Sequence, residues 1–160
     1  MQVRTGIEPL DARIGGLKPG AVYLLAGGPS AGTLTAVLQF LHAGLELGER
    51  VGLLTGHSPE EVLEEGRHWG FGLDQAWHQN RLRLLGYRGD FLQRIVQAGE
   101  PREVFEELTA LLGGPVTRLA LDPGTPLWES RATPADAQHF LDWCAQSGVT
   151  IWGTLTTDPG

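Results

Sequence analysis

The sequence predicts an α/β protein with a twisted parallel sheet of about five strands flanked by helices. Two observations lead to this prediction. Short apolar runs typical of strands alternate along the chain with amphipathic segments of helical period, and alternation of this kind implies parallel strands joined by right-handed crossovers. The 160 residues, 41% of them hydrophobic, suffice for one globular domain over residues 1–160 with its own core.

The first two strands enclose the clearest helix. We expect strands over residues 21–26 and 51–55, with a helix from Thr33 to Leu47 between them, and Gly48 as its stop. The apolar stripe of this helix consists of Leu34, Val37, Leu38, Leu41 and Leu45.

A capping sequence starts the second helix. Ser58 is the expected N-cap, Pro59 takes the first helical position, and Glu61 completes a capping box. The next strand is expected over residues 81–85. The second half of the chain should then add two more helices and two more strands. In order, these are a helix over 101–112, a strand over 118–122, a helix from Thr133 to near Gly148 and a strand over 149–155.

A glycine-framed loop follows the first strand and runs into the first long helix. It comprises Gly27, Gly28, Pro29, Ser30, Ala31, Gly32, Thr33 and Leu34. This is the context that the phosphate-binding motif G-x-x-x-x-G-K-[ST] requires. Thr33 stands where the motif needs a lysine on the β/γ-phosphates, and Leu34 where it needs a hydroxyl for Mg²⁺. The sequence therefore predicts the scaffold of a nucleotide site without its main lysine and Mg²⁺ contacts.

No other lysine can take the missing position. Lys18 is the single lysine, and it precedes the strand whose far end carries the loop. Six strand residues at ~3.3 Å each separate the two by roughly 20 Å, which exceeds the reach of a side chain. An arginine from elsewhere in the chain or from another subunit remains as an alternative. Thr35 does not replace the hydroxyl, because one step along a helix turns a side chain by about 100°.

Several short motifs, in their order along the chain, resemble a KaiC-type domain of the RecA-like ATPases. They are Thr5-Gly6-Ile7, Leu10-Asp11, Ile14-Gly15-Gly16-Leu17, Leu38-Gln39-Phe40-Leu41, Ser58-Pro59-Glu60-Glu61 and the Walker-B-like strand Leu119-Ala120-Leu121-Asp122. The resemblance covers most of the chain and implies a truncated RecA-like P-loop NTPase core, with Asp122 behind the Mg²⁺, usually through water.

The resemblance also locates the catalytic position. It implies a pair of glutamates that activate the attacking water just before Ser58, where this chain has Gly56-His57. His57 is the one catalytic candidate: it is either a substitute base or a polar strand-end residue left after activity was lost. Asp122 is likewise either part of a vestigial nucleotide site with residues 27–34 or the start of a turn, Asp122-Pro123-Gly124.

Apolar and aromatic residues complete the expectations. We expect Trp69, Trp143 and Trp152 in core or half-core positions and Cys144 as a buried small hydrophobe. Trp128 lies in a Pro/Gly-rich loop on the carboxyl side of the sheet. It either anchors a partner or folds back over the vacant pocket.

Charge bears on partners and location. The net charge of −7 disfavours nucleic-acid binding, and the scattered arginines are expected to form surface ion pairs. No run of eighteen apolar residues and no signal-peptide pattern is present, which predicts a cytoplasmic protein without membrane contact. His42, His68, His78 and His139 show no ligand spacing, so no metal site is predicted.

We also expect the chain to lack the elements that follow the last strand in a KaiC-like domain. Residues 21–26 then form an edge of the sheet. An uncharged apolar edge strand is an aggregation liability unless it is covered, so a protein partner or a homo-oligomer is predicted.

Two functions from different classes remain open. One is a degenerate, non-hydrolysing RecA/KaiC-like domain that serves as an interaction or regulatory module and needs no cofactor. The other is a nucleotide-binding ATPase or switch protein that holds ATP and Mg²⁺ through unorthodox phosphate contacts, since a loop's backbone N–H groups at a helix start still attract anions.

Overall fold

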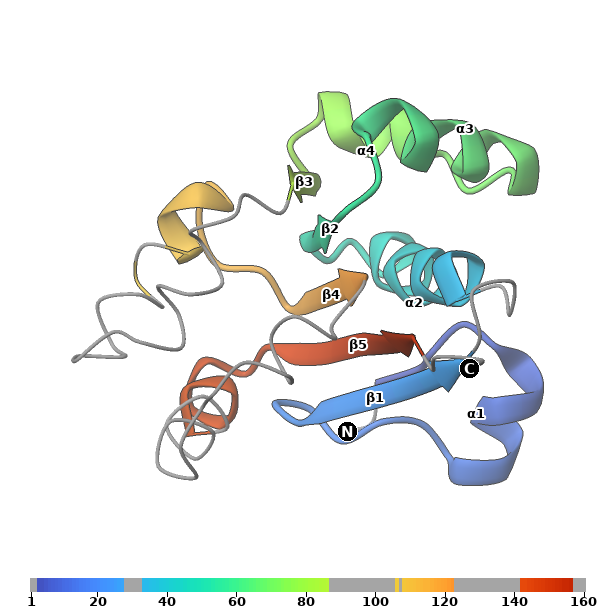
Figure 1. Cartoon of the computed structure of the whole chain (residues 1–160). Helices are drawn as coiled ribbons and strands as arrows, with labels where there is room; N and C mark the ends of the chain where they lie inside the picture. The colour runs from blue at the N-terminus through green and yellow to red at the C-terminus, as the bar shows by residue number, and fades with distance from the viewer. Residues whose placement is uncertain (1–2, 28–32, 87–105, 107, 123–141, 157–160) are drawn as a thin grey trace.

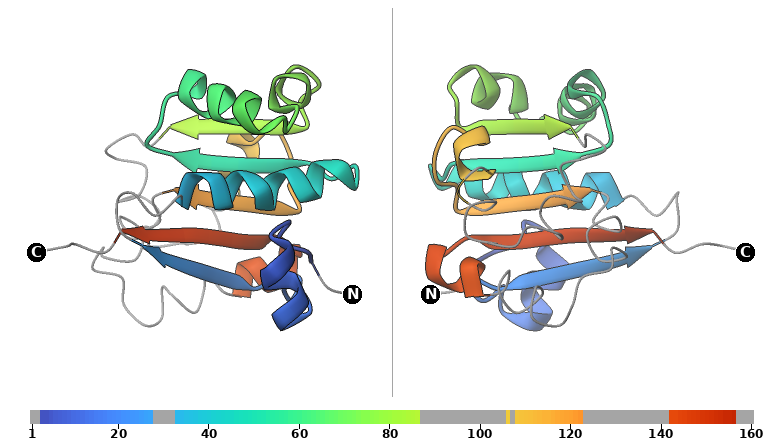
Figure 2. Two further views of the ribbon diagram at one scale, coloured as in Figure 1. Left: turned by 90° about the vertical axis from the view of Figure 1, so that its right-hand side faces the viewer. Right: turned by 60° about the vertical axis from the view of Figure 1, so that its left-hand side comes forward.

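Five strands form one parallel sheet in the order β1-β5-β4-β2-β3 (Figures 1 and 2). The computed structural model describes residues 3–27, 33–86, 106, 108–122 and 142–156. The strands are β1 (Val22–Gly27), β2 (Val51–Thr55), β3 (Leu82–Gly86), β4 (Arg118–Asp122) and β5 (Thr150–Thr156). The helices are α1 (Glu8–Ile14), α2 (Thr33–Glu46), α3 (Pro59–Trp69) and α4 (Leu73–His78). The predicted α/β class is confirmed.

The strand order also confirms that β1 is an edge of the sheet. Strand β4 is central, with β5 on one side and β2 on the other. The predicted limits of β1, β3 and β5 each lie one residue too early. Such shifts arise because a strand ends where its pairing ends, and a single sequence does not show the pairing.

Helical residues cover both faces of the sheet (Figure 2). On one face, α2, α3 and α4 pack with Val51, Leu53 and Trp152 in a first core cluster. On the other, Leu108, Leu112 and Cys144 pack against strand residues in a second cluster. Strand side chains alternate between the two clusters, as the pleat of a strand requires. The helical stretches at 108–111 and 142–147 confirm parts of the two predicted later helices; the remaining parts lie outside the described residues.

The predicted cap of α3 is present. Ser58 Oγ accepts a hydrogen bond from Glu61 N at 3.2 Å and donates to Glu61 Oε1 at 3.2 Å. Gly70 ends the helix with φ 74°, a left-handed conformation that glycine adopts without steric cost. The Glu61 side chain thus meets the Ser58 hydroxyl rather than the backbone N–H of a standard capping box.

Two short helices, α1 and α4, were not predicted. Helix α1 has seven residues and α4 has six, and neither is long enough to show a clear apolar period. Asp11 fixes the segment that enters α1, since its carboxylate accepts hydrogen bonds from Thr5 N, Thr5 Oγ1 and Gly6 N. Within the described part of the chain, no helix is long and apolar enough to cross a membrane.

Three of the aromatic and thiol predictions are confirmed and one is wrong. Trp152 and Cys144 are buried, and Trp143 is half-buried against the second cluster. Trp69, however, is 52% exposed. It lies at the end of α3, where its indole Nε1 donates to Glu65 Oε1 at 3.0 Å, so its polar edge is satisfied on the surface. Trp128 lies outside the described residues.

Arg118 contradicts the expectation that the arginines form surface pairs. Its side chain is buried at the amino end of β4, where Nε donates to Glu49 Oε2 at 2.9 Å. Nη1 donates to the carbonyl oxygens of Arg4 and Phe40, and the guanidinium lies 5.0 Å from the centre of the Phe40 ring. Burial lowers the pKa of Arg118, and the Glu49 carboxylate opposes this shift.

Helix α2 makes room for this side chain with a glycine. A Cβ atom at Gly44 would lie 2.6 Å from Cδ and Nε of Arg118, closer than real contacts allow. Because Gly44 has no side chain, the side chain of Arg118 can pass close to α2 and reach Glu49.

Replacing Glu49 tests this buried ion pair. Glu49→Gln removes the charge but keeps the shape, and it leaves the guanidinium of Arg118 buried without a counter-ion. We expect the free energy of unfolding in urea to fall by about 2 kcal/mol. Glu64→Gln, on the exposed side of α3, is the control and should change it by less than about 0.5 kcal/mol. Equal effects of the two substitutions would contradict the assignment.

Candidate functional site

The carboxyl ends of β2, β4 and β5 bring the described site residues together. Thr55 at the end of β2 is in register with Asp122 at the end of β4. The two strand ends are joined further by Gly56 N, which donates to the carbonyl oxygen of Asp122 at 3.0 Å. In open α/β sheets this edge is where ligands bind.

Asp122 is the buried acid of the site. Only 5% of the Asp122 surface is exposed to solvent. Thr154 Oγ1 on the neighbouring strand β5 donates to Oδ1 at 2.6 Å. Oδ2 is also buried but accepts no hydrogen bond from the described residues. The carboxylate is therefore fixed on one side and left with an unused acceptor on the other.

His57 faces that unused oxygen. Its Nε2 lies 3.5 Å from Asp122 Oδ2, and its Nδ1 lies 3.1 Å from Glu61 Oε2. The backbone N–H of His57 donates to Thr55 Oγ1 at 3.0 Å, which holds the turn after β2. The imidazole thus sits between a buried carboxylate and an exposed one. The structure brings together His57 and Asp122, two residues that are 65 positions apart in the sequence.

The pKa of Glu61 depends on its hydrogen-bond partners. The hydrogen bonds from His57 and then from Ser58 lower the pKa of Glu61 below its ordinary value. Glu61 is therefore ionised at neutral pH and acts as an acceptor toward both neighbours. Sequence reasoning identified Glu61 only as a capping residue and missed its contact with His57, although the i, i+4 spacing of the two was a signal.

Thr154 was missed as well. It is a buried hydroxyl of β5, as is Thr150, and such a residue needs a hydrogen-bond partner. That requirement was a visible signal, but its partner could not be named without the order of the strands.

The predicted phosphate loop is only partly described. Gly27 ends β1 and Thr33 begins α2, while residues 28–32 lie outside the described part of the chain. The side chain of Leu34 packs against the first core cluster. Thr35 donates from Oγ1 to Glu65 Oε1 of α3 at 3.1 Å, so its hydroxyl is engaged away from the loop.

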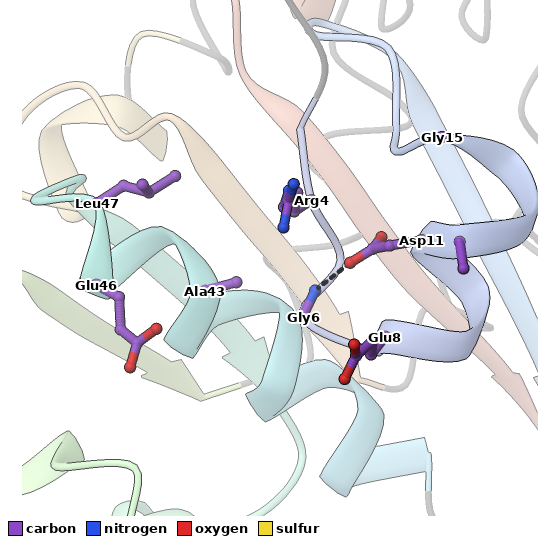
Figure 3. A pocket seen from close by; sticks show the side chains of 9 residues that line it. Arg4, Gly6, Glu8, Asp11, Gly15, Ala43, Glu46 and Leu47 are labelled. Atoms are coloured by element: carbon purple, nitrogen blue, oxygen red, sulfur yellow. Dashed lines mark hydrogen bonds between the residues drawn. The ribbon is translucent and has the colours of Figure 1, made fainter.

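A cavity of about 700 Å³ lies elsewhere, between the N-terminal segment and the end of α2 (Figure 3). Its lining residues are Arg4, Gly6, Glu8, Asp11, Ala12, Gly15, Ala43, Glu46 and Leu47. Helix α2 begins next to the phosphate loop, whereas Ala43, Glu46 and Leu47 of the cavity lie at its other end. The cavity is therefore separate from the site at the strand ends (Figure 1). Two of its acids are engaged within the protein: Asp11 with the turn at Thr5 and Gly6, and Glu46 with His42 Nε2 at 3.1 Å.

The comparison with protein families decides the identity of the scaffold. The model of the KaiC ATPase matches residues 3–146. The chain belongs to the KaiC ATPase family. No curated protein matches the chain. The KaiC match spans the loop, His57 and Asp122, whereas Thr154 lies beyond the matched range.

The pKa of Glu61 gives a test of the His57 contact. Because the pKa is lowered by folding, the stability that Glu61 contributes is present above the ordinary carboxyl pKa of about 4.3 and is lost as the pH falls through the folded-state pKa. We expect an NMR titration of the Glu61 carboxyl carbon to give a midpoint below the ordinary value, and His57→Ala to raise it. An unchanged midpoint in His57→Ala would show that the histidine is not the main cause.

A double-mutant cycle tests the Thr154–Asp122 hydrogen bond. Thr154→Val should lower the free energy of unfolding by about 1–3 kcal/mol, because a buried carboxylate loses its donor. The loss should be smaller in the Asp122→Asn background. Thr150→Val is the matched control, since this buried hydroxyl accepts from Gly20 N at 3.2 Å and does not touch Asp122. Additivity of Thr154→Val with Asp122→Asn within about 0.5 kcal/mol in urea unfolding would contradict the coupling.

Proposed function

We propose that this chain is a degenerate, non-hydrolysing KaiC-like domain that acts as an interaction or regulatory module. The observation that carries the proposal is Leu34. It stands where the family needs a hydroxyl for Mg²⁺, and its apolar side chain packs against the core. Together with Thr33 in the lysine position, this residue does not fit Mg-ATP in the way a P-loop holds it.

The catalytic position supports the same proposal. His57 replaces the glutamates that the family uses to activate water, and it is engaged by Glu61 and Asp122. Asp122, the acid that lies behind Mg²⁺ in the family, is here hydrogen-bonded to Thr154 and faced by an imidazole. The lysine, the Mg²⁺ hydroxyl and the catalytic glutamates are therefore replaced in this chain, and Asp122 is held on one side by Thr154.

The effect of these replacements on nucleotide affinity can be estimated. Loss of a charged lysine contact and of the Mg²⁺ hydroxyl removes about 1.5–3 kcal/mol each. Since about 1.4 kcal/mol corresponds to a tenfold change, a micromolar site falls to the high-micromolar or millimolar range.

The alternative function is a nucleotide-binding ATPase or switch protein with unorthodox phosphate contacts. The observation in its favour is that Gly27 and Thr33 keep the junction between a strand and a helix start, where backbone N–H groups attract anions. In that case His57 is the candidate base, because its imidazole lies at the strand-end edge beside Asp122.

Calorimetry with Mg-ATP separates the two functions. We expect no binding tighter than about 10 µM and no hydrolysis. Tighter binding would overturn the proposal, and turnover abolished by His57→Ala would establish the enzyme instead. The double substitution Thr33→Lys with Leu34→Thr should increase the affinity if the loop keeps the curve of a P-loop, which makes it a positive control for the assay.

The edge strand β1 supports an interaction role. Ile151 N donates to Ala21 O at 3.0 Å, so alternate residues of β1 direct their backbone groups toward β5. The N–H of Leu24 then points away from the sheet. Among the described residues, no backbone hydrogen bond reaches this outer side of β1. Val3, Ile7 and Leu10 pack against the first core cluster, on the face of the sheet that carries α2. We propose that a second copy of the chain pairs with β1.

Self-association tests this pairing. We expect light scattering to show a dimer or larger species, and Leu24→Pro to weaken it because proline removes the outward N–H. Leu24→Ala is the matched control, because it also removes the leucine side chain but keeps the backbone N–H. The alanine variant should therefore associate more strongly than the proline variant. Circular dichroism checks that both remain folded. A wild-type monomer at high concentration, or equal association of the two variants, would contradict pairing through β1.

A further inference from the structure

His57 and Asp122 present two acceptors to each other at the strand-end edge. A carboxylate can only accept hydrogen bonds, so the contact of His57 Nδ1 with Glu61 Oε2 at 3.1 Å places the proton on Nδ1. In the neutral imidazole, Nε2 then carries a lone pair. This nitrogen lies 3.5 Å from the buried Oδ2 of Asp122, which accepts no hydrogen bond from the described residues. A ring nitrogen with a lone pair and a carboxylate oxygen at this separation can act as two ligands of one cation.

The distance suits two ligands of one metal ion. Zinc binds imidazole nitrogen at about 2.0–2.1 Å and carboxylate oxygen at about 2.0–2.2 Å. At a tetrahedral angle these bonds place the two ligand atoms about 3.4 Å apart, close to the 3.5 Å observed between Nε2 and Oδ2. The side chain of His57 is 42% exposed, so solvent reaches the imidazole, while Asp122 Oδ2 is buried.

The surrounding contacts are those that support metal ligands. A metal-bound histidine commonly donates its other ring N–H to a carboxylate, which fixes the tautomer; here that carboxylate is Glu61. A metal-bound carboxylate is itself hydrogen-bonded, as Asp122 is by Thr154 at 2.6 Å. No group of three or more His, Cys, Asp and Glu side chains among the described residues is placed to hold a metal. The remaining positions must therefore be filled by water or by an added donor.

We propose that Nε2 of His57 and Oδ2 of Asp122 are two protein ligands of a site for a borderline divalent ion such as Zn²⁺ or Co²⁺. A ring nitrogen next to a carboxylate favours these ions over Mg²⁺, which prefers oxygen ligands. The site includes Asp122, the acid that lies behind Mg²⁺ in the family, and adds the imidazole nitrogen of His57 as a second ligand. It is independent of whether ATP binds, so it stands or falls separately from the proposed function.

The test is calorimetric titration of the purified chain with ZnCl₂ in the presence of excess Mg²⁺. We expect one ion to bind per chain with little competition from Mg²⁺. His57→Ala should abolish this binding, and Glu61→Gln, which removes an outer partner, should weaken it by about tenfold. His42→Ala is the matched control. His42 also has a carboxylate four residues later, with Nε2 at 3.1 Å from Glu46 Oε1, but the pair includes no buried acid.

Four results would overturn the proposal: no zinc binding, equal competition by Mg²⁺, unchanged binding in His57→Ala, or loss of binding in His42→Ala. Co²⁺ provides a second measurement that needs no variant. The paramagnetic ion should shift the ring resonances of His57 more than those of His42 in the NMR spectrum of the wild-type chain. Larger shifts at His42 would place the ion on the surface of α2 and contradict the site.

Discussion

The buried guanidinium of Arg118 is the interaction on which one end of the domain depends. Its partners come from the N-terminal segment, from α2 and from the turn after α2. A buried cation is tolerated only when all its partners are in place, so these three segments must assemble together against the central strand. Helix α1, which has no fully buried residue of its own, is held near the sheet by the packing of Leu10 against the first core cluster.

The opposite end of the same strand carries the candidate site. Because β4 lies between β2 and β5, Asp122 has His57 on one side and Thr154 on the other. The parallel arrangement brings all three to one edge, whatever their separation in the chain. One central strand therefore carries a buried arginine at its amino end and a buried aspartate at its carboxyl end, with apolar residues between them.

Local features of the fold could be predicted from the sequence, and contacts between distant segments could not. The cap at Ser58, the stripe on α2 and the five strands each follow from residues near one another in the chain. The burial of Arg118 could not be inferred, because its partners lie up to 114 positions away. The same holds at the site: His57 and Asp122 were each candidates, but their mutual contact and the role of Thr154 depend on strand order.

Gly44 has a consequence for how this sequence can change. In most helices, replacing an internal glycine with alanine is favourable by roughly 1 kcal/mol. Here the added methyl group would collide with the buried arginine side chain. We therefore expect positions 44 and 118 to change together. A relative with any side chain at position 44 should carry a smaller residue at position 118, and should lack the acid at position 49 or direct it to solvent.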